Sequence, residues 1–263
     1  MKASGDGFLT KNGSDKSAQI VERHLRVFEA LDEIIKRCRS FVLSADMNGQ
    51  DTTKDRQKII AIVMAIRILE ITEAAFLILK NGLSNEADTL FRVFLDAYFI
   101  FANICLDPEF VVEYFKSDEA ARLKLMNAAG KHSSEFFKAL NEYATPDLKE
   151  ELKQKIKDET IKLLKSEEYA RRAGCAEMYD SMYRLMSAPL HTTPRSLEKY
   201  IEEDQNGTIT KIKYYPIEEE IPQRAYDFAY HLIKVIGGLY DVFGSSNEIS
   251  TKAMIDELNI SVE

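Results

Sequence analysis

Apolar residues recur at helical spacing along most of the chain, and this pattern predicts a mostly helical protein. Residues 14–44 form the first predicted helix, which is amphipathic. Its apolar positions are Ile20, Leu25, Phe28, Leu31, Ile34 and Ile35. The polar stretch 45–51 predicts a loop, and Thr52 or Thr53 is a suitable N-cap for the helix that follows.

Two segments, residues 52–81 and 84–106, are apolar nearly all round. Such helices are typical of the centre of a bundle. Gly82 is the predicted stop of the first, and Asp107-Pro108 ends the second. Polar side chains interrupt both segments, which favours core helices without membrane contact. These interruptions are Arg67, Glu70, Glu73, Arg92, Asp96 and Asn103.

The rest of the chain continues the helical pattern with one exception. The remaining predicted helices cover residues 108–128, 132–143, 146–170, 176–187, 219–243 and, loosely attached, 246–258. Residues 197–201 and 208–215 flank a turn-like polar stretch, which predicts a small β-hairpin. The predicted fold is an all-α multi-helix bundle with two central apolar helices. We expect a flexible lead over 1–13, a single helical-bundle domain over 14–245 and a peripheral C-terminal helix or tail over 246–263.

Composition supports the helical prediction and narrows the function classes. With 6 Pro and 11 Gly among 263 residues, helix breakers are scarce. The net charge of -8 argues against a broad nucleic-acid surface. Cys38, Cys105 and Cys175 are far apart and without CxxC spacing, which predicts reduced thiols. Because the first residues lack an apolar signal core, we expect a cytoplasmic protein.

A small set of polar residues among apolar neighbours forms the candidate site. Isolated ionised groups are costly to bury, so each needs a partner or a chemical role. The candidate residues are Arg92, Asp96, Tyr183, Arg184, Ser187 and His191. Arg92 and Asp96 lie four residues apart and can form an ion pair within one helix. The pair is either a structural salt bridge or an anion site in which Asp96 orients the guanidinium.

Tyr183, Ser187 and His191 are spaced by four residues and predict a polar stripe. Pro189 should kink or end the helix between Ser187 and His191. We expect His191 to lie beside Arg92, because buried polar groups must find partners. A Ser-x-x-x-His pair alone is weak evidence for nucleophilic catalysis, since no nucleophile elbow or glycine-rich oxyanion loop accompanies it.

Other motifs give less support for chemistry. Glu70-x-x-Glu73 could supply carboxylate metal ligands, but the sequence lacks the Glu-x-x-His motifs of di-iron bundles. It also lacks a P-loop and a GxGxxG segment, so we expect neither a metal nor a cofactor. Gly237-Gly238 predicts a close helix contact, and His231 predicts a core histidine with a hydrogen-bond partner.

At these residues the chain resembles an uncharacterised all-helical family, the domain of unknown function 5677 family. The resemblance rests on the Arg92 and Asp96 helix, its Asp107-Pro108 end and the Tyr183-x-x-x-Ser187-x-x-x-His191 stripe, and it covers about residues 55–245. It implies a fold more than a reaction.

More distantly, the chain resembles the HEPN superfamily of helical bundles. Arg184 and His191 fit an Arg-x(4 to 6)-His pattern, which in that superfamily serves metal-independent RNA cleavage, usually across a dimer. Two features depart from the pattern: Leu185 replaces the usual polar residue after the arginine, and Pro189 intrudes.

Two functional hypotheses follow. The first is a non-catalytic helical module, in a bacterial defence or toxin–antitoxin context, that forms a homo-oligomer or binds a protein partner. The alternative is a HEPN-like ribonuclease effector, in bacterial defence or a toxin–antitoxin system, with RNA as its partner. In the alternative, His191 is the general acid/base, Arg184 or Arg92 stabilises the phosphorane charge, and Tyr183 and Ser187 orient the histidine.

Overall fold

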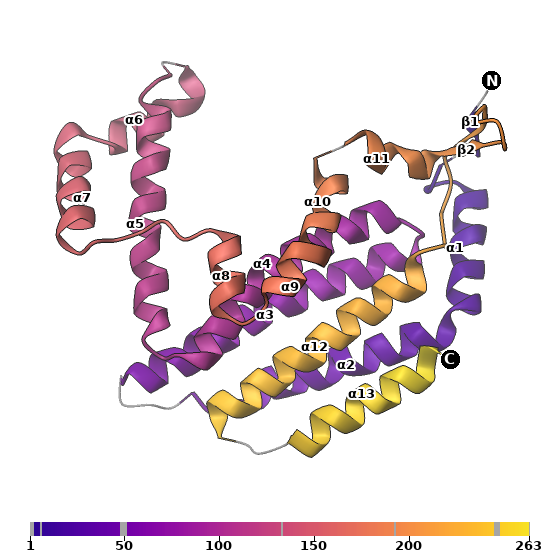
Figure 1. The fold of residues 1–263 in the computed structure, drawn as a ribbon, viewed down its shortest axis with the longest axis horizontal. Coiled ribbons are helices and arrows are strands. Elements are labelled where there is room, and N and C mark those ends of the chain that lie inside the picture. Colours follow the sequence, from indigo (N-terminus) through magenta and orange to yellow (C-terminus); the bar gives the residue numbers. More distant parts are fainter. Residues whose placement is uncertain are drawn as a thin grey trace.

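Four long helices form the body of the molecule in this computed structural model (Figure 1). The structure describes residues 3–5, 7–47, 52–132, 134–191, 193–244 and 248–262. The four are α2 (Leu25–Ser44), α3 (Thr53–Lys80), α4 (Ser84–Leu106) and α12 (Ile221–Phe243). α3 packs along α4, and α12 contacts α2, α3 and α4. The predicted all-α class is confirmed. Of the two apolar helices predicted at the centre, α4 is packed among α3, α10 and α12, whereas α3 keeps one face exposed to solvent.

Local sequence signals set both ends of α3. Thr52 caps its start, and Asp55 completes a capping box by accepting from the Thr52 backbone N–H. Gly82 follows its end with φ of 72°. A Cβ on Gly82 would stand 2.5 Å from the Pro216 Cβ, so glycine is required here by both backbone and packing. The predicted cap and stop are confirmed.

Aromatic side chains from α4 fill the core. The largest fully buried rings are Phe91, Phe94, Phe99, Phe101 and Phe228. A Cβ on Gly238 would lie 2.9 Å from the Phe101 ring, which confirms the predicted close contact of this glycine pair. α4 is long and apolar enough to cross a membrane by length and composition alone, but in the bundle it packs against α3, α10 and α12.

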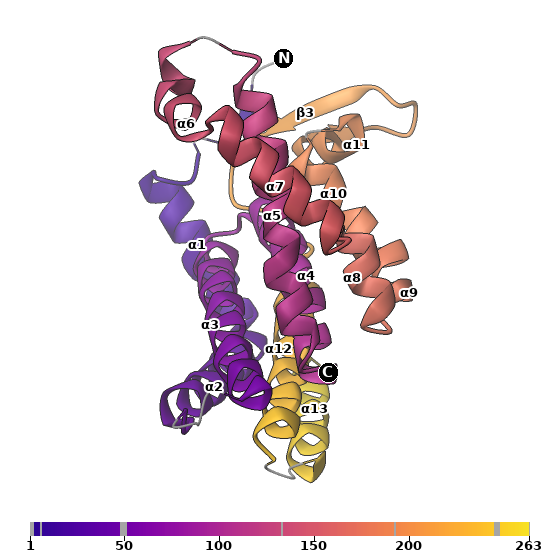
Figure 2. The same ribbon diagram turned by 90° about the vertical axis from the view of Figure 1, so that its left-hand side faces the viewer.

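An arm projects from the bundle and has a small core of its own (Figures 1 and 2). It consists of α5 (Phe110–Ala129), a 3₁₀ turn (Glu135–Phe137), α6 (Lys138–Tyr143) and α7 (Pro146–Asp158). Met126, Ala144 and Leu152 form its core. The single helix predicted over 146–170 is wrong: Thr160 adopts φ of 52°, and the chain then runs without helix to α8 (Ser166–Arg172).

The chain returns along α4 through short helical pieces. They are α8, α9 (Ala176–Met178), a π-helical turn (Tyr179–Tyr183), α10 (Arg184–Leu190) and α11 (Pro194–Leu197). The π turn was not predicted, whereas the expected helix end before His191 is confirmed. Figure 2 shows α8 to α10 on one side of the bundle and α3 on the other.

A small sheet lies at one end of the bundle (Figure 1). The predicted hairpin is present but short, because β2 (Ile201–Glu203) pairs antiparallel with β3 (Ile209–Lys213). Leu197, predicted in the first arm, ends α11 instead. β1 (Ala3–Ser4) joins β3 in parallel, which the sequence did not indicate.

Both ends of the predicted helical pattern need correction. The first predicted helix is two helices, α1 (Lys11–Arg23) and α2, separated at His24. The last helix was expected to be loosely attached, but α13 (Glu248–Val262) contacts α12 and α2 and buries Met254 and Leu258. Buried apolar contacts of this kind fix the terminal helix on the bundle.

Candidate functional site

Four of the six predicted site residues meet between α4, α8 and α10. We name this group, together with Ser166 of α8, the Arg92 cluster. Arg92 forms an ion pair with Asp96 one turn along α4, and its Nε donates to the Ser187 Oγ at 3.2 Å. The Asp96 side chain is 36% exposed, so the cluster lies at the edge of the core.

Asp96 accepts hydrogen bonds from three side chains. Besides Arg92, Ser166 donates to its Oδ1 at 2.5 Å and the Tyr183 hydroxyl donates to the same oxygen at 3.0 Å. The Arg92 guanidinium also stacks 3.4 Å above the centre of the Tyr183 ring. The carboxylate is therefore well satisfied, and the cluster joins three helices.

Local structure places these groups. Tyr183 is the last residue of the π turn, and Ser187 follows one helical turn later, donating to the Tyr183 carbonyl at 2.8 Å. Ser166 is the first residue of α8, at the end of the non-helical connection from the arm. Burial raises the pKa of Tyr183 to about 12, so its hydroxyl stays protonated and donates at neutral pH.

Arg184 and His191 lie outside the Arg92 cluster. Arg184 is exposed and pairs with Asp180 at 3.2 Å. His191 is exposed, and among the described residues its imidazole has no hydrogen bond or ion pair. The expected contact with Arg92 is not formed, because α10 ends at Leu190 and Ser187 supplies the acceptor for Arg92.

A second charged group, which sequence reasoning missed, lies deeper in the bundle. We name Asp88, Lys199, Arg224 and Asp227 the Asp88 network. The Arg224 Nε donates to Asp88 at 2.6 Å and its Nη1 donates to Asp227 at 2.6 Å. Lys199 reaches Asp88 at 2.9 Å and also pairs with Glu220. Asp88 and Arg224 are 4% and 9% exposed, so they stabilise each other away from water, whereas Lys199 is 25% exposed.

His231 extends this network into the aromatic core. Its Nδ1 lies 2.7 Å from the Asp227 carbonyl, which can only accept, so Nδ1 carries the proton. Burial lowers the pKa of His231 and raises the pKa of the Asp227 carboxyl. The predicted buried, hydrogen-bonded histidine is confirmed.

The histidine, cysteine and carboxylate side chains of the described residues are dispersed. Within the ranges that the structure describes, His, Cys, Asp and Glu side chains do not gather in a group of three that could hold a metal ion. Cys38 is a free, buried thiol whose pKa burial raises to about 12. A thiol of this kind is a weak nucleophile at neutral pH.

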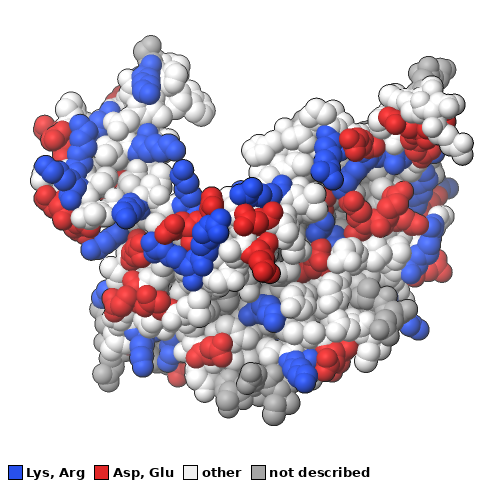
Figure 3. Space-filling view, viewed as in Figure 1, with Lys and Arg blue, Asp and Glu red and all other residues white. Residues whose placement is uncertain are grey.

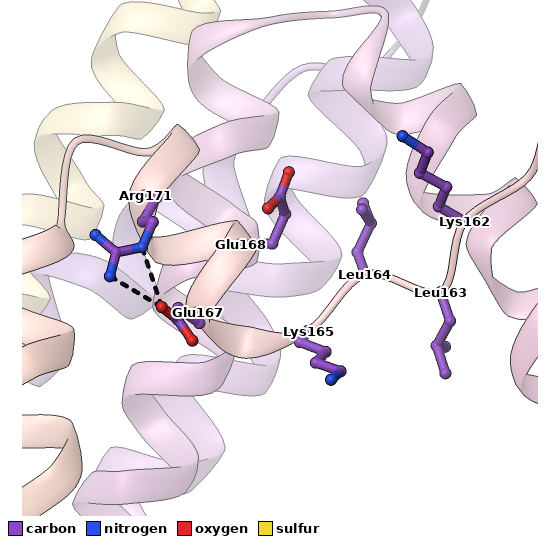
Figure 4. Close-up of a pocket in the computed structure, with 7 residues that line it drawn as sticks. All are labelled: Lys162, Leu163, Leu164, Lys165, Glu167, Glu168 and Arg171. Atoms are coloured by element: carbon purple, nitrogen blue, oxygen red, sulfur yellow. Dashed lines mark hydrogen bonds and ion pairs between the residues drawn. The ribbon is translucent and has the colours of Figure 1, made fainter.

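A surface recess of about 300 Å³ lies beside α8, where the connection from the arm enters the helix. Figure 4 shows the residues that line it. Leu163 and Leu164 line it together with Lys162 and Lys165. Glu167, also in its wall, is paired with Arg171 at 2.9 Å. Figure 3 shows acidic and basic side chains interspersed over this face. The recess therefore resembles an ordinary charged surface rather than a site built for one ligand.

The outer face of α3 is apolar although solvent reaches it. Four of its side chains, 41% to 63% exposed, form what we name the apolar row: Ile59, Val63, Ile66 and Leu77. The first three are contiguous, and Glu70 and Glu73 of the same face separate them from Leu77. A groove of about 290 Å³ adjoins the row between α3 and α5. Its walls are Arg56, Ile59, Ile60, Val111, Val112, Phe115 and Lys116. The apolar pattern of this helix predicts core positions, so the exposure of the row corrects that prediction.

Comparison with known proteins yields one match. The model of a family of unknown function, DUF5677, matches residues 58–209, from α3 into β3. No curated protein and no solved structure matches the chain. The matched range contains the whole Arg92 cluster and the apolar row, but it ends before Arg224 and Asp227. These comparisons do not show the HEPN-like resemblance.

Proposed function

The chain belongs to the DUF5677 family of unknown function, and since that membership names no activity, we propose from the geometry that it is a non-catalytic helical module that binds another protein chain through α3. The apolar row carries this proposal. Contiguous exposed apolar surface is typical of a binding face, because water contact with it is unfavourable.

The magnitude of the effect supports a binding role. Complete burial of one Val, Leu or Ile side chain contributes roughly 1.5–3 kcal/mol. The row presents four such side chains on one helix face, and Val112 and Phe115 of α5 are exposed beside it. Because these side chains are 41% to 63% exposed in the monomer, a partner that covers this face would gain about half of that contribution at each of them.

The Arg92 cluster supports the non-catalytic part of the proposal. The Asp96 carboxylate accepts hydrogen bonds from three donors. The Arg92 guanidinium contacts that carboxylate, a serine hydroxyl and a tyrosine ring. These contacts join α4 to α8 and α10. Such a network fixes the positions of the helices and stabilises the scaffold that presents α3.

One observation favours the ribonuclease alternative as a second candidate. Arg184 and His191 are both exposed and lie seven residues apart at the start and just beyond the end of α10, within reach of a macromolecular substrate. In that function His191 would exchange the proton and Arg184 would stabilise the phosphorane charge. The two functions differ in the surface that they use.

Site-specific photo-crosslinking in cells that express the chain tests the binding function. A photoreactive amino acid replaces Val63 in one variant and Leu185 of α10 in a matched control, since both side chains are 52% exposed. We expect a discrete, light-dependent protein adduct at Val63, identified by mass spectrometry, and none at Leu185. Absence of an adduct at Val63, or equal adducts at both positions, would overturn the proposal.

A further inference from the structure

The exposed positions of α3 follow a heptad pattern. Residues 56, 59, 63, 66, 70, 73 and 77 alternate spacings of three and four, which is the spacing of a coiled-coil seam. Six of the seven side chains are clearly exposed, and Glu73 is partly exposed. A second helix could therefore pack along this face through regular side-chain interdigitation.

The two ends of this seam differ in charge. Arg56 stands at its N-terminal end, Ile59, Val63 and Ile66 follow, and Glu70 occupies its C-terminal half. A surface that is basic at one end and acidic at the other is complementary to itself when one copy is reversed. Two-fold dimers use such self-complementary surfaces, because the same patch serves both subunits.

We propose that the partner of α3 is a second copy of this chain, bound antiparallel through the same helix, with Val63 of each copy opposite Ile66 of the other. This inference rests on the proposed binding function. In this register the paired residue numbers add up to 129, so Arg56 lies opposite Glu73 and Ile59 lies opposite Glu70. The apolar pairs meet at the two-fold axis and the opposite charges meet outside it.

A parallel pairing of the same helices is less favourable. It would place Glu70 against Glu70 and Arg56 against Arg56, and like charges in contact are repulsive. Within the chain, Glu73 pairs with Arg39 at 2.6 Å and Glu70 with Arg67 at 3.6 Å. These exposed ion pairs contribute little free energy each and leave the carboxylates open to a further cation.

The surroundings of α3 leave room for this contact. Its 28 residues extend over about 42 Å. Figure 2 shows that the short helices α8 to α10 lie on the opposite side of the bundle. The groove beside α5 adds Val112 and Phe115 to the surface next to the N-terminal half of the seam. This enlarges the apolar area that a second copy would cover.

Sedimentation velocity of the purified full chain tests the dimer. We expect a concentration-dependent dimer with a dissociation constant on the order of 10 μM or below. Val63→Asp places two carboxylates at the axis and should weaken association at least about tenfold, whereas Leu185→Asp should leave it unchanged. Thermal melts by circular dichroism confirm that both variants fold. A monomer at all concentrations, or equal weakening by both variants, overturns the inference.

A distance measurement tests the orientation. Spin labels on a Leu77→Cys variant should be separated by about 38 Å in the antiparallel dimer, because residue 77 lies 12.5 positions from the axis at 1.5 Å per residue. In a parallel pair the separation would approach the interaxial distance of about 10 Å. The parent chain, labelled identically, corrects for reaction of its native cysteines. A short distance overturns the proposed register.

The two proposals fail in distinguishable ways. A purified chain that stays monomeric, combined with a crosslink from Val63 to a different protein in cells, would overturn the second-copy inference and keep the binding function. Absence of any crosslink at Val63 would overturn the binding function itself. A crosslinked product of twice the chain mass supports both.

Discussion

Two charge clusters hold α4 to different neighbours, although Asp88 of one and Asp96 of the other lie on the same helix. Asp88, Arg92 and Asp96 follow one another at intervals of four residues. Asp96 pairs with Arg92 and connects α4 to α8 and α10, whereas Asp88 pairs with Arg224 of α12 and with Lys199. The Asp88 side chain is 4% exposed and the Asp96 side chain is 36% exposed.

Burial, rather than residue type or spacing, distinguishes the Asp88 and Asp96 carboxylates. Asp96 keeps contact with water, so the loss of its partner can be partly compensated by solvent. Asp88 has much less compensation, because it is enclosed with Arg224, and only Lys199, 25% exposed, connects it to the surface. The two clusters should therefore respond very differently to removal of one charge.

The largest effect should come from Asp88→Ala. This change leaves Arg224 with one partner and Lys199 with its more exposed partner, Glu220, so it should lower the free energy of unfolding by about 3–5 kcal/mol. Urea denaturation followed by circular dichroism measures the change. Glu220→Gln is the matched control: it removes the exposed carboxylate from the same lysine and should cost less than about 1 kcal/mol. Equal small losses would show that the network is not buried in solution.

A smaller loss, about 1–3 kcal/mol, is expected for Asp96→Ala. It removes the acceptor of Ser166 and Tyr183 and leaves Arg92 with the Ser187 hydroxyl and the Tyr183 ring. The same denaturation experiment applies. Replacing Arg92 and Asp96 together with Met and Leu should cost less than the single change, because no unpaired charge remains. A loss as large as that of Asp88→Ala would contradict the comparison.

The same contrast explains what the sequence could predict. Arg92 and Asp96 were identifiable because both partners lie on one predicted helix, four residues apart. Asp88 and Arg224 are 136 residues apart, and only tertiary packing brings them together. Charged residues on apolar helices indicate both pairs in the sequence. The four-residue spacing rule identifies partners only within one helix, so it finds Arg92 and Asp96 but not Asp88 and Arg224.

The other differences between prediction and structure have similar causes. The apolar pattern of residues 52–81 identified a helix at the centre, but an apolar side chain such as Val63 does not show from sequence whether a neighbour covers it. The break at Thr160 depends on a left-handed backbone that only the fold reveals. The predicted N-cap and the stop at Gly82 succeeded because their chemistry is local.

Lowering the pH should decrease the stability of the fold through His231, which adjoins the Asp88 network. Burial lowers the pKa of His231 in the folded state below the unfolded value near 6.5. Neutral His231 therefore contributes to stability above pH 6.5. This contribution is lost as the pH falls below 6.5 toward the folded-state pKa, because the unfolded chain binds the proton more tightly than the folded chain. Asp227, whose pKa burial raises, acts in the opposite sense at lower pH.

We therefore expect the urea midpoint of the chain to decrease between about pH 7.5 and about pH 5.5. His231→Gln should decrease the midpoint at neutral pH and reduce its dependence on pH. Tyr183→Phe, in the other cluster, removes a group that does not titrate in this range and serves as the control. An unchanged pH dependence in His231→Gln would show that this histidine does not control the response.

The smallest effects should come from the two predicted site residues that lie outside both clusters. Arg184→Ala and His191→Ala remove exposed side chains, so each should change the free energy of unfolding by less than about 0.5 kcal/mol. Because stability is unaffected, these variants isolate any chemistry at this surface. For a non-catalytic module, the wild type and both variants should leave a single-stranded RNA intact in metal-free buffer. Cleavage by the wild type that disappears in His191→Ala would instead establish the ribonuclease function, and with it the exposed end of α10 as the active surface.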